Sequence, residues 1–194
     1  MKITNTVTFD IHLMLDQARA LDFVRDVRKS LAHASFLSDL HVSDVPNNPF
    51  EETLEQPHQS AQPVSDLSAM QQVEASIVVN AALFGERALS FQSFVRPTAK
   101  GARLEALPFS EPKLGWAEVS GTALVQPLPQ GSNITYSFDI TIHLDLPEAE
   151  KWGGKALSKM IHYTAQRTLE RITNAFPSDI QSAADAFDLQ YSQA

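Results

Sequence analysis

The chain has 194 residues, of which 43% are apolar, so it can fold as one domain around a sizeable core without a disulfide or a metal staple. It contains no cysteine, which excludes thiol catalysis, iron–sulfur clusters and cysteine-ligated zinc. The formal net charge of −8 argues against general nucleic-acid binding, because that requires clustered Lys and Arg side chains.

Nothing in the sequence predicts a targeting or membrane-spanning segment. The first residues alternate between polar and apolar side chains and lack a continuous apolar run, so we expect no signal peptide. No stretch approaches the roughly 18 uninterrupted apolar residues of a transmembrane helix. We therefore expect a cytoplasmic protein.

The first predicted element is a strand over residues 3–13, in which polar and apolar residues alternate almost without exception. Asp16 can cap a following helix whose apolar stripe runs to Leu31. A second short helix is predicted over residues 32–40, followed by a short strand over residues 40–45.

Residues 46–72 differ from the rest of the chain. They contain four of the eleven prolines, no basic residue and no persistent apolar period. We interpret them as a solvated loop or a partly disordered excursion. The alternative is a lid or a partner-binding segment anchored by Phe50 and Leu54, because long loops on rigid scaffolds often carry function.

The negative charge is concentrated around this excursion. Between Lys29 and Arg87 the chain holds eight acidic residues and no Lys or Arg, whereas the remaining segments hold fifteen acids and fifteen bases. The whole excess of negative charge therefore lies in the segment 39–86. Such a segment could contact a basic protein partner.

A run of strands follows, at spacings typical of an antiparallel meander rather than of alternating strands and helices. The last of them alternates from Ile134 to Asp145, which indicates a half-buried strand that Pro147 closes. The predicted strands cover residues 74–84, 87–95, 102–108, 114–126 and 134–146.

A long amphipathic helix is predicted after the last strand. From Glu148 to Phe176 the apolar period changes from two to about 3.6 residues. We expect Pro177 to end this helix and Ser178 to cap a last short helix through Phe187. A half-buried strand that leads into such a helix predicts a sheet wrapped around the helix.

The order of one strand, two short helices, a meander of strands and a long C-terminal helix resembles the helix-grip fold. This is the fold of the START and Bet v 1-like superfamily, also called SRPBCC, and the resemblance covers residues 2–177. The segment VSGTALVQPLPQGSNITYSFDITIHLDLP, which the amphipathic helix follows, is especially similar to it. More narrowly, the chain resembles the uncharacterised bacterial DUF3809 family in length and in the overall character of its sequence, without a diagnostic motif.

The resemblance implies an α+β fold, with about seven antiparallel strands curved around the long C-terminal helix and two short helices after the first strand. Residues 1–177 would form a single domain that carries the excursion 46–72, and residues 178–194 a short tail with helical character. Many relatives hold a lipid, sterol, polyketide or hormone between sheet and helix. Others are enzymes or chaperone activators, so the fold does not fix the function.

No motif predicts catalysis or a cofactor. The six histidines form no HExxH spacing, and GxSxG, P-loop and GxGxxG motifs are absent. A carboxylate–imidazole cluster is conceivable on the polar face of the first and last strands, but a solvated sheet face explains these residues better, so we predict no metal site. We name no catalytic residue, expect no cofactor and lean against an enzyme. The residues of that conceivable cluster are Asp10, His12, Asp139, His143 and Asp145.

The predicted ligand pocket depends on small side chains. One face of the strand 114–126 is built from Gly, Ala and Val, and the opposing helix positions are also modest in volume, which permits either close packing or a void. Tyr136 would orient a mostly apolar ligand, or its hydroxyl would merely reach a backbone partner in a closed core. The predicted ligand-binding residues are Ala117, Val119, Tyr136, Phe138, Met160, Thr164 and Thr168.

Three hypotheses on function follow. The first is a helix-grip domain that binds a small apolar or lipid-like ligand between the sheet and the C-terminal helix. The second is a protein-interaction or assembly module with a closed core, in which the acidic segment 39–86 contacts a basic protein. The third is a cyclase or a hydrolase-like enzyme. We rank it last, because no acid–base pair can be placed in the sequence.

Overall fold

Seven strands form one sheet, in which the first and second strands in sequence are the two edges. The computed structural model describes residues 2–45, 70–81, 85–108, 115–144 and 154–192. The strand order is β1-β7-β6-β5-β4-β3-β2, and neighbours in this order pair antiparallel. The elements are β1 (Lys2–Leu13), α1 (Gln17–Arg25), α2 (Val27–Ser30), β2 (Leu37–Val45), β3 (Met70–Ala81), β4 (Gly85–Thr98), β5 (Gly101–Ala106), β6 (Gly115–Pro127), β7 (Ser132–Leu144) and α3 (Gly154–Ser192).

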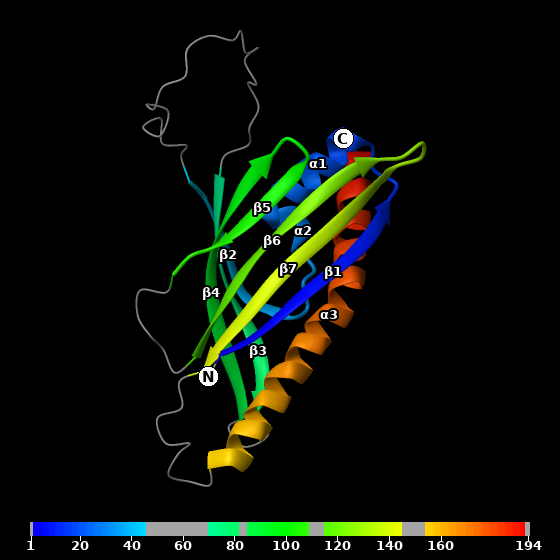
Figure 1. Cartoon of the computed structure of the whole chain (residues 1–194). Coiled ribbons are helices and arrows are strands. Elements are labelled where there is room, and N and C mark those ends of the chain that lie inside the picture. The colour runs from blue at the N-terminus through cyan, green and yellow to red at the C-terminus, as the bar shows by residue number, and fades with distance from the viewer. Residues whose placement is uncertain (1, 46–69, 82–84, 109–114, 145–153, 193–194) are drawn as a thin grey trace, which may run out of the picture.

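The long helix α3 runs along one face of the curved sheet, and α1 and α2 lie beside its C-terminal end (Figure 1). This arrangement confirms the predicted helix-grip fold, with a seven-stranded antiparallel sheet and two short helices after the first strand. None of the helices in the described ranges is long and apolar enough to cross a membrane.

The alternation of β1 and β7 produces the apolar face that α3 covers. The two strands pair over their full lengths, and the register places Phe9 opposite Tyr136 and Val7 opposite Phe138. Both apolar rows therefore lie on the same face. The polar rows lie on the other face, where side chains of the two strands hydrogen-bond in the pairs Thr4–Thr141, Thr6–Asp139, Thr8–Ser137 and Asp10–Thr135.

The first two helices differ from the sequence prediction in their positions. Asp16 caps α1 as predicted, because its side chain accepts a hydrogen bond from the Arg19 N–H at 2.9 Å. The chain then breaks at Asp26, whose carboxylate accepts from the Arg28 N–H and caps α2. The helix predicted over residues 32–40 is wrong, because Leu37 already pairs with β3 and begins β2.

Pro177 does not end the last helix. Helix α3 continues through it to Ser192, and the residues predicted as a separate short helix form its final turns. The apolar stripe continues without a change of phase, and it holds this part of the helix against the core. Its buried members beyond the proline are Ile180, Ala183, Ala184 and Phe187.

Part of the predicted excursion lies outside the described residues. This holds for residues 46–69, including the proposed anchors Phe50 and Leu54, and for residues 82–84 of the acidic segment. Residues 70–72, predicted as the end of the excursion, instead begin β3. The boundary at residue 177 between the domain and its C-terminal tail stays a prediction. The contact of segment 39–86 with a basic protein partner stays a prediction too.

Candidate ligand-binding site

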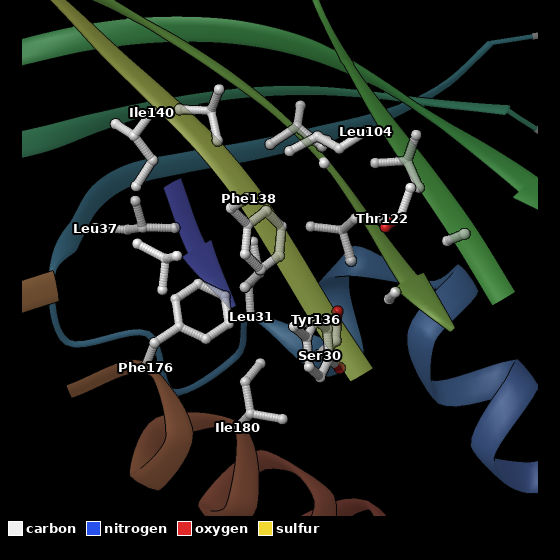
Figure 2. Close-up of a pocket in the computed structure, with 18 of the residues that line it drawn as sticks. Ser30, Leu31, Leu37, Leu104, Thr122, Tyr136, Phe138, Ile140, Phe176 and Ile180 are labelled. Atoms are coloured by element: carbon white, nitrogen blue, oxygen red, sulfur yellow. The ribbon is translucent and has the colours of Figure 1, made fainter. Parts of the chain in front are cut away.

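A cavity of about 90 Å³ lies between the sheet and the C-terminal half of α3 (Figure 2). This volume is several times what one water molecule needs, about 10–15 Å³. It is well below the roughly 300–1,000 Å³ of sites that enclose drug-sized ligands. The cavity therefore has room for one small ring or for the end of a longer molecule.

Strands β6 and β7 form one wall of the cavity through Val119, Gly121, Tyr136 and Phe138. Gly121 lies opposite Phe138 in the register of the two strands. A Cβ atom at Gly121 would lie 2.7 Å from the Cδ1 atom of Phe138, so the absence of a side chain there leaves room for the ring. The small-residue face of β6 thus accommodates the large aromatic residues of β7.

Phe176 of α3 forms the opposite wall and is the centre of an aromatic cluster. Its ring centroid lies 5.0 Å from that of Phe138, 5.1 Å from Phe36, 5.2 Å from Phe9 and 6.0 Å from Tyr136. One helix residue thereby contacts β1, β7 and the connection that leads into β2. Its neighbours on the same helical stripe, Ile172 and Ile180, also line the cavity.

The third side of the cavity is formed by α2 and by the connection between α2 and β2, which supplies Leu31 and Phe36. This connection is anchored to α3 next to the cavity. Both the backbone N–H and the hydroxyl of Ser35 donate to the Oδ2 atom of Asp179, each at 2.8 Å. These two hydrogen bonds hold the connection against the helix.

Among the residues that line the cavity, Tyr136 carries a buried hydroxyl that the packing leaves unsatisfied. The residue is 3% exposed, and its hydroxyl has no hydrogen-bond partner among the described residues. Burial raises the pKa of the Tyr136 phenol above its ordinary value of 10.0, so the group stays neutral. A neutral phenol can both donate and accept a hydrogen bond.

The other polar residues of the lining already have partners or lie near solvent. The Ser30 hydroxyl donates to the Asp26 carbonyl oxygen at 3.4 Å. Arg103 and Thr122 face each other across β5 and β6, and the exposed Arg103 guanidinium is 3.4 Å from Glu105. This side of the cavity is therefore close to the surface.

The cavity brings together three of the seven predicted ligand-binding residues, Val119, Tyr136 and Phe138. Ala117 is buried in the core but does not line the cavity. Met160 is 38% exposed, and the hydroxyls of Thr164 and Thr168 donate to carbonyl oxygens one turn earlier in α3. The last three residues belong to the N-terminal half of the helix, away from the cavity.

Sequence reasoning missed most of the cavity wall. Ile172 and Phe176 were already in the predicted apolar stripe, and Ile180 continues it beyond the proline, so periodicity was a usable signal for all three. The apolar stripe predicted after Asp16 includes Val24, Val27 and Leu31, but its period does not indicate which part of the core these residues reach. Only the tertiary fold brings Val24, Val27, Ser30, Leu31 and Phe36 to the cavity.

Three of the five polar residues considered for a metal cluster, Asp10, Asp139 and His143, contact side chains of adjacent strands. Asp10 accepts from Thr135 and Asn133, and Asp139 accepts from Thr6. His143 stacks on Trp116 with ring centroids 4.6 Å apart and places its Nε2 atom 3.2 Å from Glu118. Asp145 lies outside the described residues.

The family model described as "Protein of unknown function (DUF3809)" matches residues 45–174. No curated protein matches the sequence. Among solved structures, the chain is similar to the Zhui aromatase/cyclase from Streptomyces sp. R1128, with a TM-score of 0.54, 10% identity and 94% of each chain covered.

The chain is also similar to the di-domain ARO/CYC StfQ from the steffimycin biosynthetic pathway, with a TM-score of 0.52 and 13% identity. That match covers 98% of this chain and 53% of StfQ, so the chain spans about half the length of the di-domain protein. At such low identities the two likenesses show a shared fold.

Proposed function

Because the chain belongs to the DUF3809 family, whose function is unknown, we propose its function from the cavity. The protein binds a small, mostly apolar and uncharged ligand between the sheet and the C-terminal half of α3. The observation that carries this proposal is the Tyr136 hydroxyl, which lies buried in the cavity wall without a hydrogen-bond partner among the described residues.

An unpaired buried hydroxyl is costly in an empty protein. Leaving such a group unsatisfied destabilises the folded state by about 1–3 kcal/mol. A ligand with one hydrogen-bonding group would remove this penalty and would bury its apolar surface against Phe138, Phe176 and Ile180 at the same time. Water is a poorer occupant, because a buried water needs about two to four polar partners, and the lining is almost entirely apolar.

The chemistry of the lining limits the charge of the ligand. Arg103 and Tyr136 are the ionisable side chains among the lining residues. Arg103 is exposed and paired with Glu105, and Tyr136 is neutral. A charged group in the cavity would lose its hydration without gaining a counter-ion, which is strongly unfavourable. The buried part of the ligand is therefore uncharged.

The same lining favours binding over turnover. Two structural neighbours are aromatase/cyclases by name, and the shared fold would permit such an activity here. However, the described lining contains no His, Asp, Glu or Lys that could serve as a general acid or base near Tyr136. We therefore propose a binding protein and no reaction.

Phenol and toluene test the proposal, because they have the same ring size and differ in one hydroxyl group. Titration followed by NMR shifts of the Phe176 and Tyr136 rings should show that both bind, and that phenol binds about tenfold more tightly. Tyr136→Phe should remove the preference for phenol, and Tyr163→Phe, on the exposed face of α3, should keep it. If neither compound shifts the two rings, the proposal is wrong.

A second measurement tests whether the protein retains a natural ligand during purification. Native mass spectrometry of freshly purified protein, compared with its denatured mass, should show a fraction with the added mass of a small molecule. Phe176→Ala should change how much of that mass is retained, because it removes the central ring of the cavity wall. Repeated recovery of the bare mass from several preparations would count against a tightly held ligand.

A further inference from the structure

Strand β1 is an edge strand with one side free of any strand in the described ranges. It has twelve residues, and its partner on the other side is β7. The pairing with β7 runs from Lys2 opposite His143 to Leu13 opposite Ser132 without a shift of register. An uninterrupted edge of this kind presents a row of backbone N–H and C=O groups that can pair with another strand.

Strand β2, at the opposite edge of the sheet, has an irregularity that protects an edge strand, whereas the described residues of β1 have none. In β2 the register shifts between Ser38 and His41, and Asp39 between them has a φ of 53°. Such a bulge twists an edge strand and prevents a further strand from pairing along it. Strand β1 has no bulge and no proline, and its single Lys lies at its first position.

The outward row of β1 is complementary to itself in one antiparallel register. If a two-fold axis passes through Thr6, then Lys2 lies opposite the partner's Asp10 and Thr4 lies opposite the partner's Thr8. The two copies of Thr6 face each other on the axis. Opposite charges and Thr pairs are favourable across antiparallel strands. All of these residues are exposed in the single chain.

The two neighbouring symmetric registers lack this complementarity. With the axis at Val7, Lys2 would face the partner's His12, and with the axis at Asn5 it would face the partner's Thr8. Neither register places Lys2 opposite a carboxylate. The charge pattern of β1 therefore selects the axis at Thr6.

We propose that β1 pairs antiparallel with β1 of a second copy of this chain about a two-fold axis at Thr6, so that two sheets join into one. Such an axis is perpendicular to the sheet, so the polar faces of both copies lie on the same side. Phe9 of β1 stacks on Tyr136, so the dimer contact would also support one wall of the cavity.

The absence of cysteine allows a direct test of the register. Thr6→Cys should form a disulfide-linked dimer under mild oxidation, because the two introduced thiols would face each other across the axis. Thr8→Cys is the matched control. Its two thiols would be offset by four residues, about 13 Å, which is beyond the reach of a disulfide. A mixture of Thr4→Cys and Thr8→Cys chains should cross-link.

Charge reversal tests the pairing without a covalent bond. In sedimentation experiments the wild type should be a dimer, and Lys2→Asp should weaken the dimer about tenfold, because two symmetric pairs are lost. Asp10→Lys should also weaken it, and the double variant Lys2→Asp/Asp10→Lys should recover it. Thermal unfolding of each variant shows that the monomer still folds.

Two results would overturn the proposal. One is a wild-type chain that remains a monomer at concentrations of several hundred micromolar. The other is cross-linking of Thr8→Cys as readily as Thr6→Cys, which would indicate random collisions or a different register. Failure of the dimer would leave the ligand titrations with phenol and toluene unaffected, so the two proposals can be separated.

Discussion

The ring of Tyr136 stacks on the ring of Phe9 with centroids 5.3 Å apart and an interplanar angle of 22°. The ring is thus packed like a core residue, on an apolar face that two paired strands share. The hydroxyl group differs from those of most core residues, because it has no hydrogen-bond partner among the described residues. Tyr136 is therefore a core residue that carries one unsatisfied polar group.

Tyr136→Phe is expected to leave the free energy of unfolding of the empty protein unchanged or to raise it by about 1 kcal/mol, because it removes a buried hydroxyl that has no partner. Urea denaturation measures the change. The control Tyr163→Phe alters a 58% exposed residue and should shift the free energy by less than about 0.5 kcal/mol. A loss of more than about 2 kcal/mol in Tyr136→Phe would mean that the hydroxyl has a strong partner.

Alkaline pH should reveal the buried phenol. Burial raises the pKa of Tyr136 in the folded state, so above about pH 10 the unfolded chain releases a proton that the folded chain keeps. The stability that depends on neutral Tyr136 is therefore fully present below about pH 10 and falls as the pH rises further. Tyr136→Phe should flatten the decline of stability between about pH 10 and pH 12.

Ultraviolet absorbance of tyrosinate checks the same prediction independently. The chain has three tyrosines, of which Tyr136 is buried and Tyr163 is exposed. The absorbance change assigned to Tyr136, from the difference between wild type and Tyr136→Phe, should appear together with alkaline unfolding. If it appears near pH 10 in the folded protein, the hydroxyl is accessible to solvent.

Phe176→Ala should enlarge the cavity and destabilise the protein by about 3–5 kcal/mol, because the ring contacts four other aromatic rings. The matched control is Phe187→Ala on the same helix, whose ring packs against Phe23 and does not line the cavity. Both variants should lose stability. Phe176→Ala alone should gain affinity for naphthalene relative to toluene, as measured by NMR titration.

The sheet could be predicted from the sequence because its strands depend on a local pattern. The alternation of residues 3–13 and 134–145 identified β1 and β7 to within a few residues. The region after Leu31 could not be assigned in this way. Its apolar residues fit a short helix, but pairing of Leu37 with Ile77 of β3 selects a strand. Contacts between distant segments decide such short stretches.

The predicted ligand-binding residues on β6 and β7 include three that line the cavity, whereas those on α3 do not line it. The modest volume of Thr164 and Thr168 favoured a site in the N-terminal half of the helix, whereas Ile172, Phe176 and Ile180 line the cavity. A proline inside a helix costs about 3 kcal/mol. Burial of Ile180 and Phe187 is worth roughly 1.5–3 kcal/mol for each side chain, so tertiary packing outweighs the local penalty.

That balance predicts the effect of Pro177→Ala. The substitution supplies an N–H that can donate to the Thr173 carbonyl oxygen and removes the clash of the proline ring with the preceding turn. The free energy of unfolding should rise by about 1–3 kcal/mol, less than the full difference in helix propensity, because the half-buried ring also packs. Urea denaturation measures the gain.

The control for this prediction is Ser178→Ala, which removes the hydrogen bond from the Ser178 hydroxyl to the Ala175 carbonyl at 2.8 Å on the exposed side of the same turn. It should change the free energy of unfolding by less than about 0.5 kcal/mol. If Pro177→Ala instead destabilises the protein, the proline must set the direction in which the last turns of α3 approach α1. In that case Phe187 should lose its contact with Phe23, which lies at 5.6 Å between ring centroids, and the NMR shifts of both rings should change.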